Sequence, residues 1–192
     1  MCCLYVIRHG ETALNVSRTV QWPDTPLNSR GVWQAGRLAA RLRDAGLTRM
    51  VGSVYARARS TAESVRDMTR ARLTFDPRLR ERHMGELRGQ QYSKVRDQVF
   101  ADDFEPTNGE SWPSFHARVA DLWDALRLLI DTTHGALAVV THGFVCGALV
   151  ERHFRLDEPR NGGIYFANAS VTVVDATPPW HVRALANEVH LG

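Results

Sequence analysis

Two histidines follow apolar runs of strand length in this sequence. The run Cys3–Ile7 ends at Arg8-His9-Gly10, and the run Ala136–Thr141 ends at His142-Gly143. Continuous apolar runs of this length are typical of strands buried on both faces of a parallel sheet. Because ligands bind at the carboxyl ends of strands in open α/β sheets, we expect both histidines and Arg8 to meet at one edge.

An arginine and two imidazoles at one sheet edge form an anion site suited to phosphoryl transfer. A neutral imidazole is a competent nucleophile near neutral pH and can form a phosphohistidine, while cations stabilise the charge on the transferring group. An alcohol leaving group then needs a proton from a carboxylic acid with a raised pKa. Successive strand residues point to opposite faces, so Arg8 and His9 can serve one ligand only where the chain leaves extended geometry, which Gly10 eases.

The elements that must position these residues alternate between strands and helices. Helical spacing predicts helices over 29–45, 57–70, 114–133 and 144–154. Val32 and Trp33 are counted on the apolar face of the first helix. Runs rich in β-forming residues predict strands over 49–55, 72–75, 170–174 and 180–185. This alternation predicts an α/β fold, a three-layer α/β/α arrangement with a mostly parallel central sheet, one antiparallel edge strand and a hairpin at the sheet edge. The irregular region 76–113, with a short helix over 94–100, is the expected lid inserted in a single domain spanning 1–192.

Length and composition exclude several classes of protein. The chain has 192 residues, 44% of them hydrophobic and 23% charged, as in ordinary globular proteins, and it lacks an apolar run of the roughly 20 residues that a membrane span needs. Its bases are almost all arginine, with Lys94 the exception, but they form no basic stripe with interleaved aromatics, which argues against nucleic acid as a partner. The cysteines Cys2, Cys3 and Cys146 form no zinc pattern and are expected to pack in the core, and the apolar N-terminus lacks signal-peptide features, which together favour the cytoplasm.

An ordered set of motifs resembles the histidine phosphatase superfamily, the phosphoglycerate mutase-like proteins. The matching blocks are Arg8–Thr12 with Asn15, Asp24–Leu27 with Gly31, Ser53 with Arg57 and Thr61, Leu79–Glu81 with Gly85, Gly109–Ser111 with Arg118, Val139–Gly143, and Asn168 with Ser170. The resemblance spans positions 5 to 174.

The resemblance implies a role for each residue that the chemistry requires. His9 would be the nucleophile, Arg8, Arg57 and His142 the phosphate clamp, and Glu81 the proton donor and later the base for water. Glu110 is the rival carboxylate. Asn15 and the Gly143 backbone would add hydrogen bonds to the phosphate, Gln21 stands where the mutases have a phosphate-contacting glycine, and Arg82 would shape the leaving-group side. No metal and no cofactor are implied.

Three functions are compatible with such a pocket. We expect a phosphatase that hydrolyses a small soluble phosphomonoester, because the paired arginines that mutases place beyond Glu81–Gly85 are absent between Gln90 and Asn108, where Lys94 and Arg96 are the bases. Against this, Glu81-Arg-His-Met-Gly85 is close to the mutase motif, so a cofactor-dependent phosphoglycerate mutase is the alternative. A catalytically weak phospho-ligand binder is the third reading. The partner is expected to be a small phosphorylated metabolite, with neither nucleic acid nor membrane; the natural substrate and the oligomeric state, a homodimer included, stay open.

Overall fold

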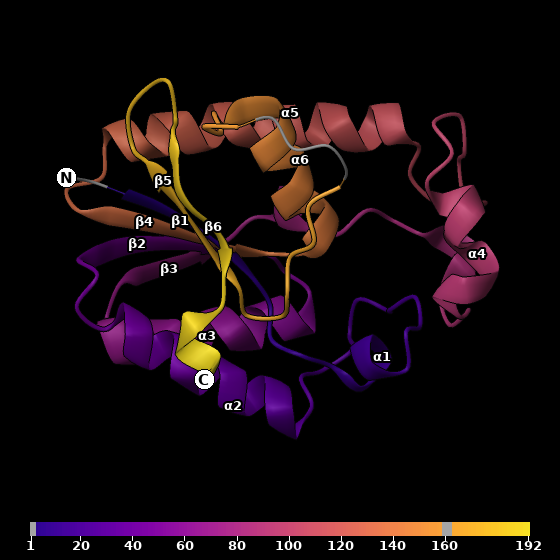
Figure 1. Ribbon diagram of the computed structural model, residues 1–192, viewed down its shortest axis with the longest axis horizontal. Helices are drawn as coiled ribbons and strands as arrows, with labels where there is room; N and C mark the ends of the chain where they lie inside the picture. The colour runs from indigo at the N-terminus through magenta and orange to yellow at the C-terminus, as the bar shows by residue number, and fades with distance from the viewer. Residues whose placement is uncertain (1–2, 159–162) are drawn as a thin grey trace.

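The fold is built on one six-stranded sheet with the strand order β3-β2-β4-β1-β5-β6 (Figure 1). A computed structural model describes residues 3–158 and 163–192. The strands are β1 (Cys3–Arg8), β2 (Leu47–Gly52), β3 (Arg72–Phe75), β4 (Ala136–Thr141), β5 (Val171–Asp175) and β6 (Val182–Asn187). The two strands that directly precede the histidines, β1 and β4, occupy the centre of the sheet, as the sequence predicts.

Strand pairing brings the two histidine-bearing ends together. β1 and β4 are parallel neighbours in the register Arg8 opposite Thr141, so His9 and His142 leave the sheet side by side. β2 and β3 continue the parallel half of the sheet. The expected hairpin at the sheet edge is confirmed as β5 and β6, which pair antiparallel. The antiparallel partner of β1 is β5, one position in from the edge, and β6 forms the edge itself.

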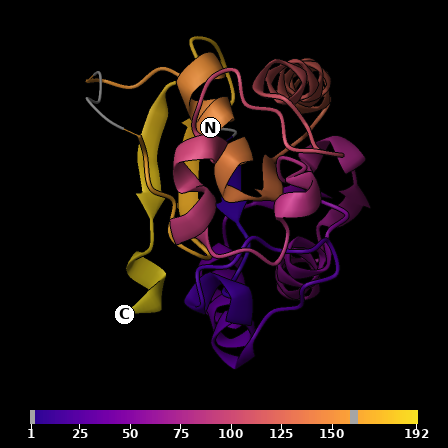
Figure 2. The same ribbon diagram turned by 90° about the vertical axis from the view of Figure 1, so that its right-hand side faces the viewer.

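Helices cover both faces of the sheet, which gives the expected three layers (Figures 1 and 2). The helices α2 (Ser29–Leu42) and α3 (Ala56–Thr69) pack on one face, and α5 (Trp112–Asp131) and α6 (Gly143–His153) on the other. Strand residues alternate between the two cores: Leu4 and Val6 of β1 face α5 and α6, whereas Ile7 faces α2 and α3. Both cores are therefore built from the same strands.

Helix α2 buries most of the expected apolar face, but two of its expected members, Val32 and Trp33, are exposed. Val32 and Trp33 are 61% and 48% exposed, whereas Gly31 and Gln34 are buried beside Ala35 and Leu38. The reason is the loop after β1: a Cβ on Gly31 would lie 2.0 Å from the carbonyl oxygen of Glu11, so the helix approaches that loop closely only through a glycine. The first turn of the helix places Gly31 and Gln34 against the site and leaves Val32 and Trp33 in solvent, while Leu38 and Leu42 pack in the core.

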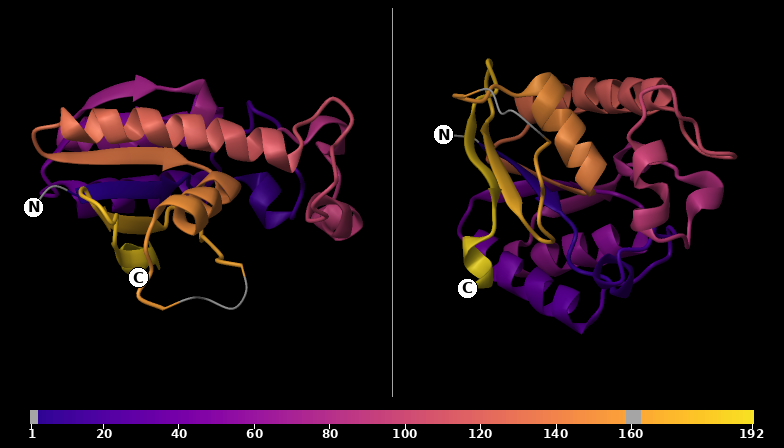
Figure 3. Two further views of the ribbon diagram at one scale, coloured as in Figure 1. Left: turned by 90° about the horizontal axis from the view of Figure 1, so that it is seen from above. Right: turned by 45° about the vertical axis from the view of Figure 1, so that its right-hand side comes forward.

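Segment 76–113 lies beyond the carboxyl ends of the strands, next to the short helix α1 (Ala13–Val16) (Figure 3). It contains the single turns η1 (Pro77–Leu79) and η2 (Gly85–Leu87) and the helix α4 (Tyr92–Val99); η3 (Val189–Leu191) ends the chain. Three of its residues, Met84, Val95 and Val99, form a separate small core together with Val20. That this segment acts as a lid stays a prediction.

Two further expectations concern the cysteines and the membrane. Cys146 is buried in the core and Cys3 is half-buried, while Cys2 lies outside the described residues. Within ranges 3–158 and 163–192, the helices include none that is long and apolar enough to cross a membrane.

Candidate active site

His9 is buried directly after β1 with its ring held in one tautomer. Nδ1–H donates to the Gly10 carbonyl at 2.7 Å, which leaves the lone pair on Nε2. The Nε–H of Arg57 donates to that nitrogen at 3.1 Å. Burial, and then the charges of Arg57 and Arg8, hold the pKa of His9 well below 6.5, so the imidazole is neutral at neutral pH. This is the state that a nucleophilic histidine needs.

Gly10 serves the site through close packing. Its amide donates to Thr61 Oγ1 of α3 at 3.1 Å, and a Cβ here would stand 2.6 Å from the Gly31 carbonyl oxygen. The two glycines at positions 10 and 31 therefore allow α2 to press against the loop that carries His9. Gly10 was expected to ease a turn out of the strand, but close approach is what excludes a side chain at this position.

Arg8 and Arg57 place two cations beside His9. The Arg8 Nη1 donates to the Phe166 carbonyl, while its Nε is buried and has no hydrogen-bond partner in the described part of the chain. Arg57, at the start of α3, also donates to the Trp22 carbonyl at 2.9 Å. Burial lowers the pKa of Arg57 to about 10, which still leaves it charged at neutral pH. The site is thus net cationic around a neutral nucleophile, an arrangement suited to a phosphoryl group.

His142 comes from the adjacent strand end, and its ring centroid lies 5.1 Å from that of His9. Its Nε2 and the Ser53 hydroxyl are 2.8 Å apart. That hydroxyl also accepts from the Tyr55 amide at 3.4 Å, and we infer that it donates its own proton to His142 Nε2, which assigns the ring proton to Nδ1. Nδ1 is buried and has no other partner among the described residues, so it presents a donor to a ligand. Burial, and then the charge of Arg57, keep the pKa of His142 well below 6.5.

Glu81 and Glu110 have opposite environments. The Glu81 oxygens accept from the amides of Arg82 at 3.1 Å and Phe144 at 3.2 Å, and burial raises its pKa above 4.5 despite these bonds. Glu110 forms a two-point ion pair with Arg118 at 2.7 and 2.8 Å; despite its partial burial, that pair holds its pKa below 4.5. Glu81 lines the cavity that holds His9 as well as a small neighbouring pocket, whereas Glu110 lines the small pocket alone. The geometry favours Glu81 as the proton donor.

Three of the expected phosphate-binding groups line the same cavity. They are Asn15, Gln21 and Gly143. Asn15 Oδ1 accepts from Thr12 and from Asn168, and Gln21 Oε1 accepts from the Thr12 hydroxyl, which leaves both amide NH₂ groups as donors for a ligand. Gly143 begins α6, whose N-terminal amides face the site and favour an anion there.

Arg82 differs from the expectation for a substrate-binding residue. Its guanidinium donates to the carbonyls of Val99 and Phe104 at 2.8 Å and of Glu110 at 2.9 Å, and it stacks 3.9 Å from the Trp112 ring. The side chain is 2% exposed. Its charge is committed to holding the backbone of segment 76–113, so it shapes the cavity wall without reaching toward the phosphate cluster.

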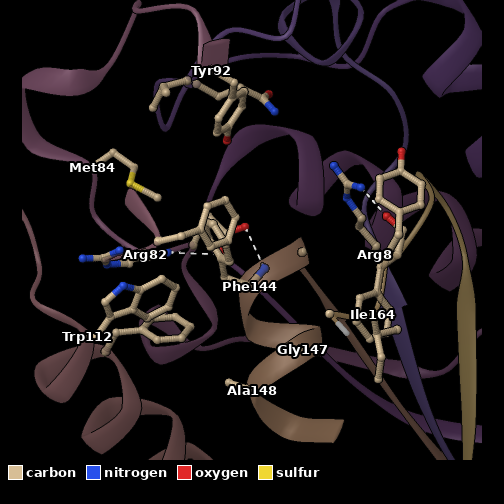
Figure 4. Close-up of a pocket in the computed structure, with 18 of the residues that line it drawn as sticks. Arg8, Arg82, Met84, Tyr92, Trp112, Phe144, Gly147, Ala148 and Ile164 are labelled. Carbon is tan, nitrogen blue, oxygen red and sulfur yellow. Dashed lines mark hydrogen bonds between the residues drawn. The ribbon is translucent and has the colours of Figure 1, made fainter. Parts of the chain in front are cut away.

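The cavity that contains this cluster measures about 1190 Å³ and continues along α6. Figure 4 shows Arg8 and Ile164 on one side and Arg82, Met84 and Trp112 on the other, with Phe144 and Gly147 of α6 between them. Residues that the sequence did not single out also line it: Tyr92, Arg88 and Arg152, as well as the aromatic rings of Trp112 and Phe144. They come from elements far apart in the chain. Nothing in the local sequence distinguishes Trp112, in the irregular region 76–113, or Phe144, at the start of a predicted helix, as a cavity residue. Among residues 3–158 and 163–192, no cluster of three or more potential ligands could hold a metal ion.

Comparisons with known proteins identify a family for nearly the whole chain. The family model described as the histidine phosphatase superfamily (branch 1) matches residues 4–187. A protein named probable phosphoglycerate mutase GpmB from Proteus mirabilis is 31% identical, over 94% of this chain and 88% of its own. Among solved structures, Bacillus stearothermophilus YhfR is 30% identical with a TM-score of 0.83 over 100% of both chains. A mycobacterial glucosyl-3-phosphoglycerate phosphatase, solved with VO3, is 27% identical with a TM-score of 0.76 over 91% of each chain.

Proposed function

This chain belongs to the histidine phosphatase superfamily, and we propose that it hydrolyses a small phosphomonoester through a phosphohistidine on His9. The observation that carries the proposal is the state of His9: a neutral ring, protonated on Nδ1, whose Nε2 accepts from the Arg57 guanidinium and whose pKa is lowered by burial and by the charges of Arg57 and Arg8. The nitrogen is nucleophilic and the surrounding charge attracts its electrophile.

The first step transfers the phosphoryl group to His9. Arg8 and the Nδ1–H of His142 bind the phosphoryl oxygens, and the Arg57 Nε–H turns from His9 Nε2 to the same oxygens. The freed Nε2 lone pair forms a bond to phosphorus as the bond to the ester oxygen breaks. Glu81 lines the cavity, and burial raises its pKa and favours the protonated form, so it can give its proton to the leaving oxygen. Alcohol is released and Glu81 is left as a carboxylate.

The second step returns the enzyme to its starting state. The Glu81 carboxylate removes a proton from water, whose oxygen attacks phosphorus as the bond to His9 breaks. Inorganic phosphate leaves, and Glu81 is again protonated. A cavity of about 1190 Å³ has room for both a leaving group and the attacking water.

A trapping experiment tests this function. Mixing the enzyme with a radiolabelled phosphomonoester and quenching in base should yield a phosphoprotein that is stable in base and labile in acid. His9→Ala should lose both the label and p-nitrophenyl phosphate hydrolysis, whereas His134→Ala, at an exposed position away from the site, should keep both. Undiminished hydrolysis by His9→Ala would refute the assignment of the nucleophile.

Phosphoglycerate mutase is a second candidate, favoured by one observation. The cavity is lined by three arginines from separate positions, Arg88, Arg96 and Arg152. They could bind a substrate carboxylate in place of the adjacent pair of arginines expected in a mutase. Incubation with 3-phosphoglycerate and catalytic 2,3-bisphosphoglycerate separates the two functions. We expect free phosphate as the main product; conversion mainly to 2-phosphoglycerate would establish the mutase instead.

A further inference from the structure

The cavity has an apolar arm that the phosphoryl chemistry does not use. We define this apolar arm as Met84, Trp112, Phe144, Gly147, Ile164 and Phe166, all of which line the cavity beyond the phosphate cluster. Figure 4 shows that Trp112 and Met84 lie across the cavity from Ile164, with α6 between them. The leaving group of a bound phosphomonoester must lie on the side of the cluster that leads into this arm or out to solvent.

The aromatic wall of the arm is held rigidly. The Trp112 indole N–H donates to the Val99 carbonyl at 3.1 Å, and the Arg82 guanidinium stacks 3.9 Å from its ring. Phe144 meets Trp112 edge-on, with ring centroids 5.4 Å apart. Because the polar atom of Trp112 is already bonded, the wall offers ring surface to a ligand and few polar contacts.

Gly147 of α6 keeps the arm open. A Cβ at this position would have Phe166 as its nearest neighbour, at 3.9 Å, which is ordinary contact distance. A longer side chain on Gly147 would therefore extend into the cavity without a backbone clash. The small residue at this turn of the helix leaves space between Phe144 and Ile164 that a planar group can fill.

Most of the charges that line the cavity away from the phosphate cluster lie at its rim or are already paired, and the half-buried Arg88 is not part of the apolar arm. Arg96, Asp102, Glu151 and Arg152 are exposed, so water solvates them, and the donors of Arg82 are directed to backbone carbonyls. His116 stacks on the Trp112 ring of this wall and also lines the cavity, but the six residues of the apolar arm carry no charge, so a carboxylate or a polyol in contact with them would lose water without gaining a charged partner among them. An apolar ring would instead gain contact and leave water.

We propose that the substrate is a phosphomonoester of a bulky apolar alcohol, with an aromatic ring seated in the apolar arm. The inference rests on the proposed function, because it takes the phosphate cluster as the place where the ester bond breaks. It separates this chain from an enzyme for compact, carboxylate-bearing substrates, whose leaving group would leave the arm unfilled.

Two alkyl esters with the same reacting bond provide the test. Ethyl phosphate and 2-phenylethyl phosphate are both esters of primary alcohols, so they differ chiefly in the ring. We expect kcat/KM for the phenylethyl ester to be about 10- to 100-fold higher, the gain that burial of one aromatic ring supports. Hydrolysis of both esters at equal rates, or preference for the ethyl ester, would overturn the inference and leave the phosphatase standing. Failure of both esters to react would refute the proposed function itself.

Variants locate the effect in the arm. Gly147→Leu should lower the preference for the phenylethyl ester at least about 5-fold, because its side chain occupies the space of the ring. Gly36→Leu is the matched control: Gly36 is an exposed helical glycine of α2 with no atom within 4 Å of its Cβ position, and the preference should not change. Phe100→Ala provides a second variant, since Phe100 lines the cavity, is 56% exposed and touches Phe144. A preference unchanged in both Gly147→Leu and Phe100→Ala would refute the placement of the ring.

Discussion

Replacing Glu81 by glutamine removes the acidic proton from the site and leaves the size of the side chain almost unchanged. Glutamine has a single acceptor oxygen, so either the Arg82 amide or the Phe144 amide would face an NH₂ group in place of a carboxyl oxygen. An unsatisfied buried amide costs about 1–3 kcal/mol of the free energy of unfolding. We therefore expect a modest loss of stability and, separately, a large loss of one kind of activity.

The activity loss depends on the leaving group. General acid catalysis contributes about 10²–10⁴-fold where the leaving oxygen needs a proton. For 2-phenylethyl phosphate, whose alkoxide is a poor leaving group, Glu81→Gln should lower the rate of phosphorylation of His9 by that factor. For p-nitrophenyl phosphate the leaving group departs readily as the anion, so phosphorylation should fall much less. Single-turnover measurements of the labelled enzyme with the two esters give both rates.

Glu110→Gln is the matched control. Its ion pair with Arg118, in which the side chains are 12% and 15% exposed, lies outside the cavity, so the change should cost about 2 kcal/mol of stability and leave the rate ratio of the two esters unchanged. If Glu81→Gln slowed both esters equally, or if Glu110→Gln reproduced its selective effect, the assignment of Glu81 as the acid would be wrong.

Three further predictions follow from the contacts around the nucleophile. Ser53→Ala removes the donor to His142 Nε2, and kcat/KM should fall about 10-fold because the Nδ1 proton is no longer fixed; an unchanged value would contradict the tautomer argument. Gly31→Ala forces its Cβ to within 2.0 Å of the Glu11 carbonyl and should cost about 3 kcal/mol in urea unfolding, whereas Gly36→Ala on the same helix should not destabilise. His9 and His142 stay neutral in the fold but take up protons when unfolded below pH 6.5, so their contribution makes the free energy of unfolding fall as the pH drops below 6.5. Unfolding curves at several pH values check this, and the slope should be smaller in His142→Gln.

The core of the site could be predicted from local pattern. His9 and His142 each follow a continuous apolar run, and parallel pairing of two such strands leaves their ends adjacent whatever the rest of the chain does. The Glu81 assignment came from resemblance, and the structure adds the physical reason to prefer it over Glu110, namely which carboxylate has an arginine partner.

Other features depend on contacts between distant segments and leave no local signal. Helical spacing counted Trp33 as buried, but the close approach of Gly31 to the loop after β1 turns that side chain to solvent. The resemblance implied that Arg82 shapes the leaving-group side, whereas its side chain binds the carbonyls of Val99 and Phe104, 17 and 22 residues further along the chain. Only tertiary packing decides where a long side chain ends.

The hydrogen bonds by which Arg82 holds segment 76–113 together affect how the molecule fluctuates in its native state. His9 follows β1, which is paired on both sides in the middle of the sheet, so its backbone amides should exchange with solvent only on global unfolding. The Arg82 guanidinium, by contrast, binds carbonyls of residues 99, 104 and 110 within the segment that also carries Glu81 and Trp112, so local opening there would displace the acid and the Trp112 wall together. A molecule opened in this way keeps its nucleophile and loses its proton donor. It would still accept a phosphoryl group from an activated ester while failing to cleave an alkyl one, so ester selectivity would report how often the segment opens.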